Sequence, residues 1–272
     1  MELFDRSTIP LRLTPAGECF VEAGRRMIDM EHQLQKQLSE IKQNKNSTIR
    51  LGISPSRAPY LMPTVISTYR QINPSAKIVI KERTTAELSR MLACGDLDLI
   101  ISLLDEESRS FERIDLFEED LMLALPQALY HPDITAQEVL TMHTLITVGR
   151  GLALWQTMHE ILATLNVAEP EIECQSIDSA LSLVRKGMGA TIVPSYVAQY
   201  ASDGQNESIR FLKLPTDLFA KQASSCRRTV CLFYRKEQFL TEAERQLIDC
   251  VRKEVAEQTA TRSKSYYEKE NL

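Results

Sequence analysis

The sequence is poor in the residues that mark disordered or fibrous chains. Among 272 residues there are only 9 glycines and 11 prolines, while 43% are hydrophobic and 25% are charged. These proportions are those of a globular protein, so they exclude collagen-like repeats and low-complexity scaffolds for most of the chain. At roughly 100–200 residues per domain, the length allows two domains, or one domain with an appendage.

Long apolar runs and an excess of positive charge are also missing. No run of about 18 apolar residues occurs, which excludes a membrane-spanning helix, and the first residues lack the basic and apolar regions of an export signal. Lysine and arginine number 32 against 37 acidic residues, giving a net charge of −5. A chain that neutralised many phosphates unaided would be basic. We therefore expect a cytoplasmic protein that has no membrane partner and binds DNA poorly by charge alone.

The sequence lacks the motifs of metal and enzyme chemistry. Its 6 cysteines have no CxxC spacing, and its 4 histidines stand at no ligand spacing, so we expect reduced thiols and no metal site. No Walker loop, GxSxG elbow or HExxH motif occurs. Gly187-Met188-Gly189 follows a predicted helix, the reverse of the dinucleotide-binding order, and we interpret it as a helix end and tight turn. We expect neither an enzyme nor a bound cofactor.

The first 46 residues predict a hairpin followed by one long helix. Residues 3–13 alternate around a turn, and Thr14-Pro15 provides an N-cap and a proline at the first helical position. The helix should run to about Asn44. Apolar residues recur along it at every seventh position, and these are Phe20, Met27, Leu34 and Ile41. This spacing is typical of a seam between two helices, so we expect dimerisation; the alternative is packing on the chain's own globular domain.

After a polar linker at 43–47, short apolar strands and amphipathic helices alternate. The predicted strands are 48–53, 77–82, 97–102, 120–125, 144–148, 171–174, 190–193, 209–214 and 228–234. The predicted helices are 58–72, 86–93, 152–165, 176–187, one from Pro194 and one opened by Thr241 and Glu244. This order indicates parallel sheets covered by helices, in two α/β lobes with a cleft between them.

Polar side chains stand where the predicted strands pass into helices. Ligands of open α/β sheets bind beyond the carboxyl ends of strands, where helix N-termini attract anions. The residues at these junctions, which we predict to bind a small ligand, are Ser54, Ser56, Arg57, Thr84, Thr85, Gly149, Arg150, Gln175 and Ser176. The two arginines favour an anion. The alternative for Thr84 and Ser176 is ordinary helix capping.

Several segments together carry a resemblance to a known family. They are Phe4-Asp5-Arg6, LRLTPAG at 11–17, IRLGI at 49–53, YLMP at 60–63, GDLDL at 95–99 and GMGATIVP at 187–194. In this order and spacing, across about residues 3–255, they resemble LysR-type transcriptional regulators. The GMGAT stretch is most similar to the branch that contains the nitrogen assimilation control protein.

The resemblance implies a winged helix-turn-helix, a dimerising linker helix and a two-lobed effector domain similar to type 2 periplasmic binding proteins. It also implies co-inducer contacts at positions that match Ser54, Ser56, Arg57, Thr84, Arg150 and Ser176. Arginine is not the family's usual residue at the two arginine positions, so the role of Arg57 and Arg150 is inferred from their charge. The implied segments are a remnant wing at 1–14, the linker helix at 15–46, lobe I at 47–127 and 229–257, lobe II at 128–228 and a disordered tail at 258–272. Since the family's recognition helix precedes the matched wing, we expect a truncated DNA-binding domain, in which Arg6 and Arg12 contact DNA phosphates at most.

The sequence thus predicts a regulator of transcription. Its expected partners are a small anionic co-inducer, promoter DNA in the full-length protein, and further copies of itself in a homodimer or homotetramer. A solute-binding protein of a transporter shares the lobed fold, but it would need an export signal and no long helix before the first lobe. An enzyme on this fold is a second alternative, which the missing catalytic motifs disfavour.

Overall fold

The computed structural model describes residues 1–7, 10–41, 48–104, 107–150, 152–202, 208–215, 218 and 227–269. The chain divides into two compact units. The first contains Met1–Ile53, Thr64–Ile114 and Leu232–Arg252, and the second contains Ser54–Pro63, Asp115–Cys231 and Lys253–Leu272. The sequence-based prediction has lobe boundaries near 127 and 228, and it assigns the whole of the predicted helix 58–72 to lobe I.

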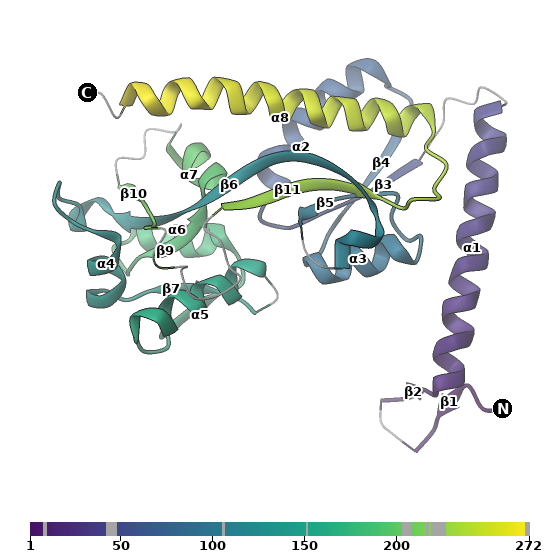
Figure 1. Ribbon diagram of the computed structural model, residues 1–272, viewed down its shortest axis with the longest axis horizontal. Coiled ribbons are helices and arrows are strands. Elements are labelled where there is room, and N and C mark those ends of the chain that lie inside the picture. The colour runs from purple at the N-terminus through teal and green to yellow at the C-terminus, as the bar shows by residue number, and fades with distance from the viewer. Residues whose placement is uncertain are drawn as a thin grey trace. The chain divides into compact units, whose positions relative to one another are not determined.

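The first unit opens with the predicted hairpin and long helix (Figure 1). β1 (Phe4–Asp5) pairs antiparallel with β2 (Arg12–Leu13), and α1 (Pro15–Ile41) follows. The Thr14 hydroxyl accepts a hydrogen bond from the Gly17 N–H at 3.0 Å, which caps α1 as predicted. A Cβ at Gly17 would lie 2.0 Å from the Leu3 carbonyl oxygen, so only glycine lets the hairpin approach the helix this closely. The predicted end of the helix near Asn44 lies outside the described residues.

A parallel sheet forms the centre of the first unit, as the alternating pattern predicted. β3 (Thr48–Ile53) lies between β4 (Lys77–Glu82) and β5 (Leu99–Leu103) and is parallel to both. α2 (Ala58–Ile72) and α3 (Thr85–Ala93) connect these strands, and a 3-10 turn (η1, Glu107–Ser110) follows them. The apolar side chains of β3 and β5 are buried, which is expected of strands covered on both faces.

The second unit is built on a long strand, β6 (Glu112–Pro126), which begins in the first unit. β9 (Thr191–Pro194) and β10 (Ile209–Lys213) both pair antiparallel with β6. A separate parallel pair is formed by β7 (Ile146–Val148) and β8 (Ile172–Cys174). The other elements of this unit are η2 (Gln127–Leu129), α4 (Ala136–Met142), α5 (Ala153–Leu165), α6 (Ile177–Arg185) and α7 (Ser195–Ser202). β11 (Arg227–Tyr234) and α8 (Glu242–Lys269) each have residues in both units.

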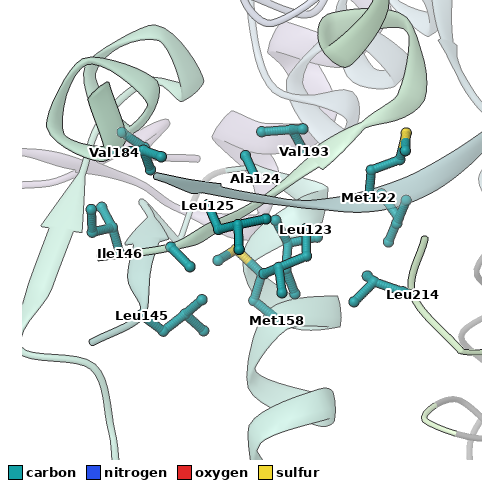
Figure 2. Close-up of a cluster of buried hydrophobic side chains, with 14 of the residues drawn as sticks. Met122, Leu123, Ala124, Leu125, Leu145, Ile146, Met158, Val184, Val193 and Leu214 are labelled. Carbon is teal, nitrogen blue, oxygen red and sulfur yellow. The ribbon is translucent and has the colours of Figure 1, made fainter. Parts of the chain in front are cut away.

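The core of the second unit gathers apolar side chains from β6, β7, β9 and the helices beside them. Figure 2 shows Leu123 and Leu125 of β6 facing Met158 of α5, and all three side chains are fully buried. At about 1.5–3 kcal/mol for each large apolar side chain removed from water, this cluster is a main source of the unit's stability. This core therefore fixes the positions of β6, β7 and β9 and of the residues that follow these strands.

Three features differ from the sequence-based prediction. β6 begins at Glu112 rather than at 120. The prediction missed the first half of this strand because it carries charged residues that stay partly exposed. α4 was not predicted, although Thr135 and Glu138 form a capping box at its start. α8 continues to Lys269 through residues expected to form a tail, and no glycine or proline interrupts it.

The glycine turn after α6 has the predicted form. Gly187 has φ +77°, its N–H bonds the carbonyl of Val184, and the Met188 N–H bonds the carbonyl of Leu183. This pair of bonds is the Schellman arrangement that ends a helix with glycine. None of the described helices is long and apolar enough to cross a membrane.

Candidate functional site

The structure places the predicted ligand residues in both units. Thr84 and Thr85 belong to the first unit, at the start of α3. The others belong to the second unit, and they are Ser54, Ser56, Arg57, Gly149, Arg150, Gln175 and Ser176.

In the first unit, Thr84 acts as a helix cap. Its hydroxyl accepts from the Glu87 N–H, and the Glu87 carboxylate accepts from the Thr84 N–H at 3.0 Å. These bonds satisfy two of the free donors at the start of α3. Capping alone therefore accounts for Thr84, and a ligand role for Thr84 or Thr85 stays a prediction.

In the second unit, Ser54, Ser56 and Arg57 form one cluster at the start of α2. The Ser54 and Ser56 hydroxyl oxygens lie 3.3 Å apart, and Arg57 Nη1 donates to Ser54 Oγ at 3.1 Å. The backbone N–H groups of Arg57 and Ala58 both bond the Ser54 carbonyl. Sequence reasoning thus brought together three residues that do lie together.

Arg57 also meets partners that sequence reasoning missed. Its Nη2 donates to Oε1 of Glu119 at 2.6 Å, and Nη2 of Arg228 donates to the same oxygen at 2.6 Å. The guanidinium carbon of Arg57 lies 5.6 Å from the ring centroid of Tyr196, whose hydroxyl donates to the Ser56 carbonyl at 2.9 Å. We call Arg57, Glu119 and Arg228 the buried charge cluster. Because the hydrogen bonds of this cluster join residues 62 and 109 positions apart in the sequence, no local sequence pattern predicts it.

Burial governs the electrostatics of this cluster. The side chains of Arg57 and Glu119 are 5% and 0% exposed, and that of Arg228 is 14% exposed. Burial opposes the charge of Arg57, but Glu119 outweighs it and raises the pKa of Arg57. At Arg228, burial dominates and lowers the pKa, with repulsion from Arg57 adding to it. Burial raises the pKa of Tyr196 to about 12, so its hydroxyl stays neutral.

A second group of predicted residues surrounds the start of α6. Ser176 caps this helix, since its hydroxyl accepts from the Ser179 N–H at 3.1 Å. Tyr60 of α2 donates to Oδ1 of Asp178 at 2.6 Å, which ties the first turn of α2 to the first turn of α6. Burial and this bond to a carboxylate raise the pKa of Tyr60.

Gly149 and Gln175 leave the β7–β8 pair side by side. The register pairs Val148 with Cys174, and a Cβ at Gly149 would lie 3.1 Å from Oε1 of Gln175. The next residue, Arg150, is exposed, and its guanidinium carbon lies 5.3 Å from the ring centroid of Trp155. This cation–π contact orients the guanidinium without neutralising it.

The predicted seam of α1 is exposed along its length. Its residues, with their exposed fractions, are Phe20 (64%), Met27 (70%), Leu34 (54%) and Ile41 (78%). A polar face of α1 packs on the first unit instead: Asp29 accepts from Arg235 at 3.0 Å, and Lys36 donates to Asp98 at 2.6 Å. The helix therefore packs on its own unit without covering the seam, and dimerisation stays a prediction. Arg6 and Arg12, the predicted phosphate contacts, lie exposed in the hairpin segment.

A comparison with protein families shows to which family the chain belongs. A family model described as the LysR substrate binding domain matches residues 42–256. The chain belongs to the LysR substrate-binding domain family. Its α/β fold preceded by a long helix is thereby confirmed, and regulators of this family are not enzymes.

Individual relatives are distant. A probable RuBisCO transcriptional regulator of Trichormus variabilis is 26% identical over 70% of this chain and 59% of its own length. The DNA-binding transcriptional dual regulator OxyR of Escherichia coli is 23% identical over 92% of this chain and 80% of its own length. The chain thus spans about 59% of the length of the former relative.

Solved structures support the same fold. An OxyR mutant of Corynebacterium glutamicum superposes with a TM-score of 0.63 at 21% identity, covering 97% of this chain and 82% of the other. A full-length OxyR variant of Pseudomonas aeruginosa gives a TM-score of 0.61 at 21% identity, with 92% and 84% covered. At these identities the likeness establishes the fold alone.

Proposed function

We propose that this chain is the effector-binding part of a LysR-type transcriptional regulator, and that it binds a small anionic co-inducer at the starts of α2 and α6. The proposed contacts in the second unit are Ser54, Ser56, Arg57, Gly149, Arg150, Gln175 and Ser176. The observation that carries the proposal is the buried charge cluster, in which two guanidiniums share one carboxylate.

The physical reason is that a buried, incompletely balanced positive charge favours an anion. The helix dipoles at the starts of α2 and α6 act in the same direction. A charge-assisted hydrogen bond from arginine contributes roughly 1.5–3 kcal/mol, which is about ten- to a hundredfold in affinity. Arg150 adds an exposed guanidinium near Gly149 and Gln175.

Regulation would follow if the ligand binds two conformations of the chain unequally. α1 is fixed to the first unit through Lys36 and Asp29, so a change in that unit would move α1 and whatever it carries. The proposed assembly is a homodimer or homotetramer joined along the exposed seam of α1, acting on promoter DNA in the cytoplasm. The branch within the family stays a prediction.

The names of several relatives suggest a response to hydrogen peroxide instead. Such a response through cysteine requires a thiolate. Cys174, which directly precedes Gln175, has its pKa raised by burial, so it is a poor peroxide-reactive thiol. The structure therefore favours an anion over thiol oxidation at this position.

Calorimetry on the full chain tests the proposal with acetate, malonate, benzoate, phosphate and sulfate as ligands. The test variants are Ser54→Ala and Arg150→Ala. The matched controls are Ser182→Ala, on the exposed side of α6, and Arg210→Ala, whose guanidinium stacks on Tyr130 as Arg150 stacks on Trp155.

At least one anion should bind the wild-type chain, and each test variant should weaken it about tenfold or more. The control variants should leave the affinity unchanged. Failure of every anion to bind, or an affinity that neither test variant alters, would contradict the proposed site.

A further inference from the structure

The buried charge cluster joins three segments on which the chain passes between its units. The chain enters the second unit at Ser54, shortly before Arg57, and again at Asp115, shortly before Glu119. It leaves the second unit after Cys231, shortly after Arg228. All three residues nevertheless belong to the second unit.

The cluster carries one positive charge in excess. Two guanidiniums donate to a single carboxylate oxygen, Oε1 of Glu119, and the neighbouring Tyr196 is neutral. Three further buried polar atoms of the cluster, Oε2 of Glu119 and Nε of both arginines, have no hydrogen-bond partner among the described residues. Buried ions without full pairing are costly, so a complementary ion that completes the cluster is favoured.

The charges on the neighbouring positions do not complete it. Arg227 contacts Glu118 and Asp120 at 3.3 Å, and all three side chains are more than half exposed. Water screens these groups strongly, so they contribute little to the field at the buried arginines. Arg150, the other guanidinium of the proposed site, is also exposed, so water screens its charge in the same way. The buried excess charge is therefore set within the cluster, by two arginines, Arg57 and Arg228, against one carboxylate, Glu119.

We propose that Glu119 determines ligand specificity: it reduces the charge of the Arg57–Arg228 pair to +1, so that the site accepts a singly charged carboxylate in preference to a dianion. This inference rests on the proposed function, because it concerns the same anion site. A monoanion brings the buried charge to zero, whereas a dianion would leave an uncompensated negative charge in a poorly solvated environment. Guanidiniums also suit carboxylates geometrically, since they donate two parallel N–H bonds.

Removing the charge of Glu119 should reverse this preference. Glu119→Gln keeps the size of the side chain and leaves the two arginines with a charge of +2. The matched control is Glu118→Gln, the adjacent residue on β6, which changes the net charge of the chain equally but lies on the surface. Each variant is checked by circular dichroism before binding is measured.

The probes are monomethyl succinate and succinate, which share a carbon skeleton and carry one and two charges. Calorimetry on the full wild-type chain should show tighter binding of monomethyl succinate. In Glu119→Gln the ratio of the two affinities should shift toward succinate by about ten- to a hundredfold, while Glu118→Gln should behave as wild type.

A second pair of variants keeps the test decisive if Glu119→Gln fails to fold. Arg228→Gln leaves the balanced pair of Arg57 and Glu119, so it should fold and should bind monomethyl succinate at least tenfold more weakly. Arg228→Lys retains the charge and should retain the preference for the monoanion. Arg227→Gln is the exposed control and should change neither affinity.

The outcomes separate this inference from the proposed function. If Ser54→Ala and Arg150→Ala weaken an anion but Glu119→Gln leaves the charge preference unchanged, the specificity role of Glu119 is wrong while the site stands. If Arg228→Gln binds monomethyl succinate as wild type does, the cluster does not contact the ligand. If neither probe binds wild type or Glu119→Gln at tens of millimolar while another anion of the panel binds, the preference for a singly charged carboxylate is wrong and the site stands. If no anion of either set binds, both proposals fail.

Discussion

Replacing Asp98 by asparagine should loosen the attachment of α1 to the first unit. The Asp98 side chain is 0% exposed. It accepts from the backbone N–H of Arg50 at 2.7 Å, from Arg50 Nη2 at 2.7 Å and from Lys36 Nζ at 2.6 Å. Lys36 also donates to Glu244 at 2.7 Å, so Asp98 lies where α1, β3 and α8 meet.

The expected loss follows from the burial of this network. Removing one partner of a buried ion pair typically costs 3–5 kcal/mol, because the remaining charge stays desolvated. The lower end applies to Asp98→Asn, since Lys36 keeps Glu244 and Arg50 is 22% exposed. With a urea m-value of about 1–3 kcal/mol per molar, the unfolding midpoint should fall by roughly 1–3 M.

The effect should depend on pH in one direction. Burial opposes the charged form of Asp98, but Arg50 and Lys36 outweigh burial and lower its pKa. A group whose folded pKa is lowered stabilises the protein above its unfolded pKa, here about 3.9, and loses that contribution as pH falls through the folded pKa. The difference between wild type and Asp98→Asn should therefore be constant above about pH 5 and shrink in stronger acid.

Urea unfolding followed by circular dichroism at pH 7 and at pH 3 measures both effects. Asp96→Asn is the matched control, because Asp96 is exposed and lies two positions away; its midpoint should stay near that of wild type. If the midpoint of Asp98→Asn stays within about 0.3 M of Asp96→Asn at pH 7, the network does not stabilise the first unit.

Three further predictions concern assembly, the glycine turn and DNA. The chain should be at least dimeric, and Met27→Glu with Leu34→Glu should give monomers in sedimentation experiments; a dimeric double variant would show that the seam is not the main interface. Gly189→Ala should lower the free energy of unfolding by about 1 kcal/mol or more, since Gly189 has φ +152° and a Cβ there would lie 2.2 Å from the Thr144 carbonyl oxygen. The control Gly24→Ala places its new Cβ with no atom within 4 Å, so it should raise the free energy of unfolding by up to about 1 kcal/mol. In fluorescence anisotropy the chain should bind duplex DNA weakly and without sequence preference, because its net charge is −5 and the described residues up to Ile41 form only the hairpin and α1; tight, sequence-selective binding would refute this expectation.

Local sequence signals were sufficient for most of the fold. The start of α1 follows from Thr14 and Pro15, and the end of α6 follows from Gly187, because capping chemistry depends on residues adjacent in sequence. The bounds of α2 are those predicted from its apolar face. The first half of β6 was missed because a strand with exposed charges shows no clear alternation of apolar residues.

The candidate site could be predicted only in part. Ser54 and Arg57 were found because strand-to-helix junctions are visible in the sequence. Glu119 and Arg228 were not, because they reach Arg57 from distant strands, and a buried glutamate in β6 looks in sequence like the exposed glutamate beside it. Seam residues such as Met27 were predicted because apolar residues recur at every seventh position along α1. The polar contacts that attach α1 to the first unit show no such repeat in the sequence.

The central claim is that a small anion binds at the starts of α2 and α6, and amide hydrogen exchange tests it most directly. The full chain is compared with and without monomethyl succinate, with Arg150→Ala as the variant. A bound anion held by the side chains of these segments restrains the local opening that amide exchange requires, so exchange should slow at 54–61 and 176–180 and little elsewhere in the second unit. The slowing should be smaller in Arg150→Ala. Unchanged exchange in both segments at a saturating anion concentration, or protection confined to other segments, would contradict the account.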